Sequence, residues 1–156
     1  MFATRRTFLR FAALCVLVAA ACSLAGPRPI AYGAATCDFC RMTVGDERFG
    51  SEFVTAHGKI MTFDSIECLA GYAAQARAPG STGEAYVADF THPGTLLRAD
   101  KAQFLRATTL HSPMGRGLVA VPTGADITAL VTALGAGHTL SWSDVLTLVQ
   151  THPVHA

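Results

Sequence analysis

Two short runs of interspersed apolar and polar residues stand out along this chain. They cover residues 49–55 and 59–63, and His57-Gly58 lies between them. Glycine accommodates the positive φ that a tight turn requires, so the pattern predicts two strands joined as a β-hairpin.

A helical pattern follows the hairpin. Its apolar positions repeat at helical spacing: Ile66, Leu69, Ala70 and Ala73. Asp64, with Glu67 three residues later, forms a capping-box pattern that predicts the helix start, and Pro79-Gly80 predicts its end. Residues 85–88 then predict a third strand. The predicted order of the first half is therefore strand, strand, helix, strand.

The second half repeats this order more loosely. Residues 95–98, 104–109 and 117–121 are predicted to be extended. Thr123 and Asp126 are expected to cap a helix that ends at 135–137. The buried stripe of that helix consists of Ile127, Leu130, Val131 and Leu134. Ser141 predicts the cap of a last helix.

These patterns together predict an α+β fold with two small ββαβ-type subdomains. The first is expected at residues 37–91 and the second at 92–150, with a tail at 151–156. Each subdomain is too small to be very stable alone, so we expect the two to pack on each other.

The N-terminal region has a different pattern. Arg5-Arg6 precedes an apolar run at residues 11–21. Eleven residues rise only about 16 Å as a helix, roughly half the hydrocarbon thickness of a bilayer. We therefore expect residues 1–21 to be a cleaved signal of the twin-arginine kind and not a permanent span.

Cys22 follows small residues in a pattern that resembles a lipoprotein box, although Ala19 stands where leucine is usual. We expect lipid on Cys22, and residues 22–36, which contain several prolines and glycines, to be a flexible tether. Ordinary cleavage after Ala21 or near Ala35 is the alternative, and it gives a soluble periplasmic protein. Both routes place the chain outside the cytoplasm of a bacterium, with the lipid-anchored form held at the membrane.

The amino-acid composition indicates a globular protein and does not favour nucleic acid as its partner. The chain of 156 residues is 51% hydrophobic and 15% charged, which indicates a globular protein and not a disordered one. Lysines and arginines number 12 against 11 aspartates and glutamates, so nothing favours a nucleic-acid partner.

Of the five cysteines, Cys15 leaves with the signal and Cys22 carries the lipid. Three remain, so at most one disulfide can form within the chain.

Three sulfur-bearing residues lie close together: Cys37, Cys40 and Met42. A Cys-x-x-Cys pair can bind zinc or form a disulfide, and the spacing alone does not choose. Met42 favours Cu(I), because this soft ion prefers thiolate and thioether donors. In an extended segment Met42 also points to the same side as Cys40.

Several alternatives to copper remain open. Met42 can simply fill a gap in the core, beside a Cys37–Cys40 disulfide. The pair can also serve a thiol-disulfide oxidoreductase, although Thr43-Val44-Gly45 does not look like the helix that such a motif opens. A structural zinc module is the third alternative. No recognisable nucleophile motif supports hydrolysis.

Five motifs in order resemble the NosL family of copper-binding lipoproteins. They are Cys-x-x-Cys-x-Met, residues 62–69, residues 86–90, residues 112–117 and Leu140-Ser141-Trp142. The resemblance runs from Cys37 to about Leu146. It implies a periplasmic, non-enzymatic chaperone that binds one Cu(I) ion and supplies an extracytoplasmic acceptor, apo nitrous oxide reductase. It also implies two ββαβ-type domains and a distant fold kinship with organomercurial lyase.

The resemblance implies Cys40, Met42 and Met114 as copper ligands. Pro113 and Gly115 flank Met114 and predict a turn that presents its thioether. The further candidate ligands are Cys37, Cys68 and, as an auxiliary, His111. Cys68 follows the predicted helix start, where the helix dipole favours a thiolate. Arg41 stands where the family often has glycine, which bears on the geometry of the site.

Overall fold

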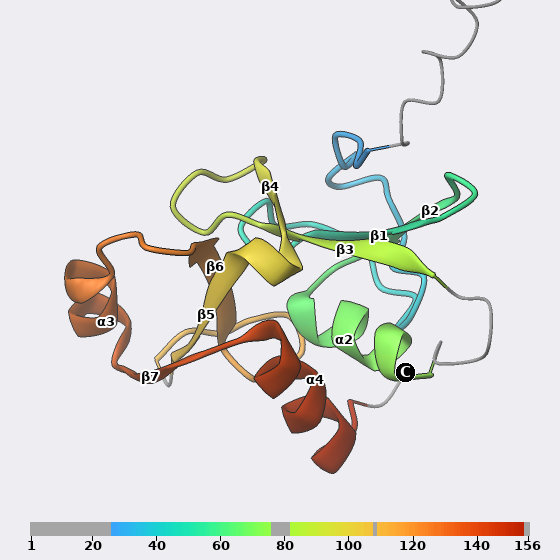
Figure 1. The fold of residues 1–156 in the computed structure, drawn as a ribbon. Helices are drawn as coiled ribbons and strands as arrows, with labels where there is room; N and C mark the ends of the chain where they lie inside the picture. Colours follow the sequence, from blue (N-terminus) through green and yellow to red (C-terminus); the bar gives the residue numbers. More distant parts are fainter. Residues whose placement is uncertain (1–25, 76–81, 108, 155–156) are drawn as a thin grey trace, which may run out of the picture.

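The computed structural model describes residues 26–75, 82–107 and 109–154. Two antiparallel sheets stand next to each other, one of four strands in the order β2-β1-β3-β4 and one of three in the order β6-β5-β7. Helix α2 (Ile66–Gln75) lies against α4 (Trp142–Thr151), which comes from the far end of the chain (Figure 1). The predicted α+β class with two small units is confirmed.

The first sheet contains the predicted hairpin, β1 (Ser51–Thr55) and β2 (Ile60–Phe63), with Gly58 in the turn at φ 78°. Strand β3 (Gly83–Ala88) pairs with the other edge of β1. Strand β4 (Leu96–Arg98) pairs with β3. The prediction that residues 95–98 belong to the second half is wrong, because these residues complete the first sheet.

The second sheet has β5 (Ala102–Ala107) at its centre, between β6 (Leu118–Pro122) and β7 (Ala136–Leu140). A short 3-10 helix, η1 (Ala99–Lys101), leads from β4 into β5. Helix α3 (Thr128–Leu134) ends at Gly135, which adopts the left-handed conformation at φ 61°. The two glycines at residues 135–137 predict this helix end correctly, but they gave no sign of strand β7, which begins in the same segment. With β7 included, both halves begin strand, strand, helix, strand; β4 follows in the first half and α4 in the second.

In the second half, the cap of α4 and the packed side of α3 match their predictions. The predicted cap of α3 by Thr123 and Asp126 is wrong, because Ile127 occupies the N-cap position, without a side-chain cap hydrogen bond. Ser141 accepts a hydrogen bond from the Asp144 amide and forms a full capping box with that residue at the start of α4. The predicted stripe of α3 packs, partly buried, against Phe49, Leu105 and Val119. Local sequence therefore determines where α4 begins and which side of α3 packs inward.

One hydrophobic core joins the two units. Phe63 and Leu69 from the first unit belong to the same buried cluster as Phe104, Leu118 and Val145 from the second. The sheets are also linked directly by a parallel bridge from Asp89 to Ala120. The predicted packing of the two halves on each other is thus present.

The segment before the first sheet is attached to the domain. The Arg28 amide donates a 2.9 Å hydrogen bond to Oε2 of Glu52, and the Gly33 amide donates one of 2.8 Å to the carbonyl of Val44. Ile30 and Tyr32 pack on the main core. The prediction of a flexible tether at 22–36 is therefore wrong for residues 28–36. The first residues of that segment, the predicted signal at 1–21 and Cys22 lie outside the described residues.

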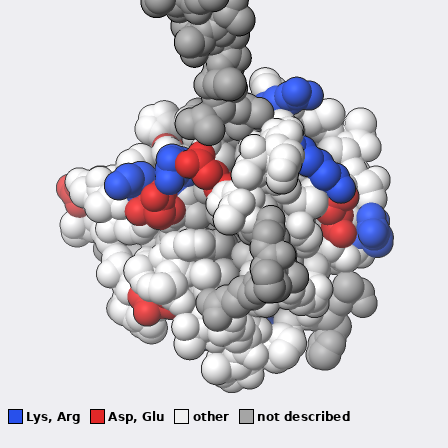
Figure 2. Space-filling model, turned by 45° about the vertical axis from the view of Figure 1, so that its right-hand side comes forward, with Lys and Arg blue, Asp and Glu red and all other residues white. Residues whose placement is uncertain are grey.

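Charged side chains on one face of the protein are mixed in sign. Figure 2 shows Lys and Arg beside Asp and Glu, in groups separated by uncharged surface. Arg48 pairs with Asp46 at 2.6 Å, and Arg98 pairs with Glu84 at 2.6 Å. Such exposed pairs contribute little to stability. Among the described residues, no helix is both long and apolar enough to cross a bilayer.

Candidate metal centre

The loop from Cys37 to Met42 is closed by its own backbone and lies on the free edge of β2. The Cys37 amide donates a 2.8 Å hydrogen bond to the Met42 carbonyl. Asp38 and Thr62 exchange two more bonds, since the Asp38 amide donates to the Thr62 carbonyl and the Thr62 amide to Oδ2 of Asp38, each at 2.8 Å. These bonds fix Cys37 and Cys40 against the end of the hairpin.

Arg41 lies at the tip of this loop in a conformation that favours glycine. Its φ is 67°, and it is the one residue other than glycine with positive φ within the described segments. A side chain in the left-handed region costs roughly 1–2 kcal/mol, whereas glycine adopts it freely. This explains why a glycine suits this position in the family that the sequence resembles.

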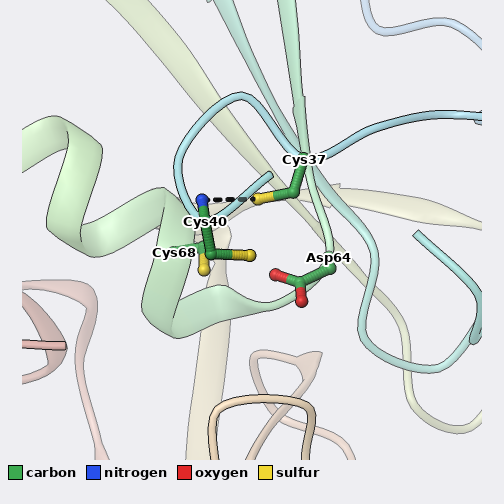
Figure 3. Close-up of side chains that lie close together, drawn as sticks. All are labelled: Cys37, Cys40, Asp64 and Cys68. Atoms are coloured by element: carbon green, nitrogen blue, oxygen red, sulfur yellow. Dashed lines mark hydrogen bonds between the residues drawn. The ribbon is translucent and has the colours of Figure 1, made fainter. Parts of the chain in front are cut away.

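Helix α2 presents Cys68 to the loop, and its cap differs from the prediction. Ser65 caps the helix, because its Oγ accepts a 3.2 Å hydrogen bond from the Cys68 amide. The predicted capping box of Asp64 with Glu67 is wrong. The helix begins one residue later than that box requires, and Asp64 is free to turn its carboxylate toward the cysteines (Figure 3).

Four side chains form what we call the Cys/Asp cluster: Cys37, Cys40, Asp64 and Cys68. One ligand atom from each lies within 4.8 Å of those of all the others (Figure 3). All three cysteines are free thiols. Cys37 and Cys68 are fully buried and Asp64 is 2% exposed, whereas Cys40 is only half-buried. The cluster thus has one face near the surface and one deep in the core.

The three thiols differ in acidity. The Cys68 thiol donates toward the Cys37 sulfur and lowers the pKa of Cys37 to about 6. The same interaction, together with burial, raises the pKa of Cys68. Burial raises the pKa of Cys40 to about 11. The Cys40 amide also donates a 3.5 Å hydrogen bond to Sγ of Cys37. Near neutral pH the cluster therefore holds one thiolate, Cys37, beside the protonated thiols of Cys40 and Cys68.

Asp64 is the member of the cluster that the sequence analysis missed as a site residue. Neither of its carboxylate oxygens has a hydrogen-bond partner among the described residues, although both are buried. The available signal was its position, directly after a strand and four residues before Cys68. The capping-box pattern with Glu67 already gave Asp64 a role as a helix cap, so the residue was not considered as a metal ligand.

The two predicted methionine ligands lie outside the buried part of the cluster. Met42 is 46% exposed, at the end of the loop that carries Cys40. Met114 is partly buried against the main core, in a turn closed by the Gly115 amide donating to the Ser112 carbonyl at 2.9 Å. His111, the predicted auxiliary ligand, is exposed, and no histidine of the described segments joins the Cys/Asp cluster.

A family model described as NosL matches residues 30–148. The chain belongs to the NosL family. The matched range includes the whole Cys/Asp cluster and both methionines of this NosL chain.

The fold is similar to a crystal structure of the copper chaperone NosL from Shewanella denitrificans, with a TM-score of 0.59 and 20% identity. The match covers 76% of this chain and 96% of that one. At this identity the likeness concerns the fold. No curated protein matches the chain in sequence.

Proposed function

We propose that this NosL protein is a carrier and not an enzyme, and that it binds one Cu(I) ion through Cys40 and Met42. The observation that carries the proposal is the position of Cys40. This half-buried thiol lies in the cluster with the buried Cys37, and the exposed Met42 follows it by two residues in the same loop. Cu(I) prefers such sulfur donors. The Shewanella relative, which is titled a copper chaperone, supports the same function.

The acidities of the thiols suit capture of a cation. With a pKa of about 6, Cys37 is already a thiolate near neutral pH and attracts the ion. Cys40 holds its proton until copper displaces it, because its pKa is raised to about 11. Cys37 or Met114 then completes a low-coordinate site. Copper binding is therefore accompanied by proton release.

Transfer depends on the exposed side of the site. Met42 is 46% exposed and Cys40 is half-buried, so an approaching partner can contact both donors. An incoming thiolate or imidazole can replace these two donors one at a time, so copper is not released into solution. The buried Cys37 and Cys68 are shielded from the partner during this exchange.

The place of action and the recipient are part of the proposal. A twin-arginine signal at 1–21 and lipid on Cys22 would hold the domain at the periplasmic side of a bacterial membrane. The acceptor would be an extracytoplasmic copper protein, with apo nitrous oxide reductase as the candidate that the family resemblance supports. Copper-dependent activation of apo nitrous oxide reductase by the purified, loaded protein is the direct test of that recipient.

The copper site is tested by anaerobic Cu(I) titration of the reduced protein against a competing chelator. Cys40→Ser removes a thiolate and Met42→Leu a thioether, and each should weaken Cu(I) binding by about tenfold or more, which corresponds to at least 1.4 kcal/mol. Met61→Leu is the matched control, because this methionine is buried in the first sheet and the exchange conserves volume. Equal affinity of wild type and both site variants would overturn the proposal.

A thiol-disulfide oxidoreductase is the second candidate, and the low pKa of Cys37 favours it. Burial argues against it. Cys37 is fully buried and lies in a loop, so a protein disulfide cannot reach its sulfur. An insulin-reduction assay distinguishes the two, since turnover that is lost in Cys37→Ser would support the oxidoreductase and an inactive wild type would support the carrier.

A further inference from the structure

The tip of the loop from Cys37 to Met42 carries an unpaired positive charge. Arg41 is exposed, and its guanidinium forms no ion pair or side-chain hydrogen bond within the described segments. Asp38 is the one carboxylate on the same loop, and its Oδ2 accepts a 2.8 Å hydrogen bond from the Thr62 amide at the edge of β2. The charge of Arg41 is therefore available to another molecule.

The backbone at Arg41 is strained, and the contacts of its side chain do not explain why. A φ of 67° is the left-handed conformation, which glycine adopts freely and an arginine does not. Strain of this kind clusters at sites where proteins bind ligands or partners. Because the guanidinium has no partner in the described chain, the arginine does not repay its strain through the stability of the domain. Its position therefore points to a contact with a different molecule.

Arg41 lies between the two proposed copper donors, Cys40 and Met42. Met42 is 46% exposed and is the one exposed large hydrophobic side chain of the described segments. Arginine and methionine are both enriched in protein–protein interfaces, where a cation and an apolar anchor often act together. A molecule that contacts the guanidinium is thereby brought next to the atoms from which copper leaves.

We propose that Arg41 is a docking residue for the copper acceptor, and that the acceptor surface it fits carries carboxylates beside its own copper ligands. This inference rests on the proposed copper-carrier function. A guanidinium binds a carboxylate through two parallel hydrogen bonds and attracts it over several ångströms. Copper moves as Cu(I), with no change of oxidation state. Its bonds to Cys40 and Met42 are exchanged for bonds to the acceptor, and the Cys40 thiolate takes up a proton from water.

The test measures how fast copper leaves the reduced, copper-loaded protein for two chelators under anaerobic conditions. Bathocuproine disulfonate is anionic, whereas neocuproine is uncharged and has the same kind of nitrogen donors. The ratio of the two second-order rate constants reports the attraction of negative charge, because a change in copper affinity affects both rates. Arg41→Glu should lower the ratio by about fivefold or more at low salt, and Arg41→Gln by less. The differences should disappear near 1 M salt, where charges are screened within about 3 Å.

Lys101→Glu is the matched control, because it reverses the charge of an exposed cation far from the loop. Lys101 follows β4, which lies at the edge of the first sheet opposite β2, and this variant should keep the wild-type ratio. An unchanged ratio in Arg41→Glu, or an equal fall in Lys101→Glu, would overturn the docking role. Arg41-dependent binding to phosphatidylglycerol vesicles with an unchanged ratio would also overturn it and assign the loop to a membrane surface.

Failure of this inference is distinguishable from failure of the carrier function. If wild type binds Cu(I) and the chelator ratio does not depend on Arg41, only the docking role is lost. If wild type binds no Cu(I), the carrier function is overturned, and the docking role with it. Urea unfolding of each variant establishes that it is folded.

Discussion

The hydroxyl of Ser112 donates a 2.8 Å hydrogen bond to Oε1 of Glu67, across 45 positions of the chain. Ser112 also accepts a 2.9 Å bond from the Gly117 amide, so it holds both ends of the turn that carries Met114. Glu67 is fully buried in the first turn of α2, next to Cys68. This contact therefore fixes the turn of the second unit to the helix that presents a cysteine of the first.

Ser112→Ala should destabilise the fold and weaken copper binding together. The change removes the 2.8 Å hydrogen bond to Oε1 of the buried Glu67 carboxylate, whose Oε2 already lacks a partner. We expect a loss of about 1–3 kcal/mol in urea unfolding. If the turn acts through Met114, the affinity loss should disappear in a Met114→Leu background. Glu67→Gln keeps an acceptor and should have the smaller effect, and a larger effect would contradict the role given to Ser112.

Removal of the Cys68 thiol should change the acidity of Cys37. The pKa of Cys37 is lowered to about 6 chiefly because Cys68 donates toward its sulfur. In Cys68→Ala that pKa should rise toward its ordinary value, so Cys37 becomes protonated at neutral pH. Thiolate absorbance near 240 nm, followed from pH 5 to 9, measures the change. Cys37→Ser identifies the signal, and a transition near pH 6 that persists in Cys68→Ala would contradict the assignment.

Arg41→Gly should stabilise the domain. The substitution relieves roughly 1–2 kcal/mol of left-handed strain at φ 67° and gives back about 0.5–1 kcal/mol in chain entropy. A net gain of about 0.5–1 kcal/mol is expected in urea unfolding. Arg41→Ala is the control, since it removes the exposed side chain and keeps the strain. Equal stability of the glycine and alanine variants would show that the conformation carries no penalty.

Gly117→Ala should be far more destabilising than Gly115→Ala. Both glycines have positive φ, at 66° and 73°, and both belong to the turn that ends at β6. A Cβ at position 117 would collide with the carbonyl oxygen of Ala107, whereas a Cβ at 115 meets open space. We expect the first variant to lose at least about 2 kcal/mol more than the second. Similar urea midpoints would contradict the close approach.

Local signals in the sequence predicted those parts of the fold that are decided within a few residues. The hairpin at Gly58 and the Ser141–Asp144 cap are examples, because turn conformation and capping depend on immediate neighbours. The pairing of β4 with β3 was not predictable in this way, since strand partners are chosen by the whole sheet. The glycines around β7 likewise resembled a simple helix end.

The candidate site was likewise predicted only in part, where local sequence decides it. The sequence indicated Cys37, Cys40 and Cys68 because thiols are common metal ligands, and the structure brings these three together. Met42 and Met114 as ligands stay predictions. The placement of Cys68 beside Cys37 depends on the packing of α2 under the hairpin, which no local pattern contains. Asp64 was misassigned because a residue before a helix is usually a cap, and only burial without a partner reveals a different role.

The attachment of the chain at Arg28 would limit how far a lipid-anchored form of the domain can travel from a membrane. With lipid on Cys22, only the residues from 22 to 28 would separate the bilayer from the folded part. Six residues, even fully extended, span about 20 Å. The carrier would then search a thin layer above the membrane and not the full depth of the periplasm. Its local concentration for partners held at the same surface would be correspondingly high.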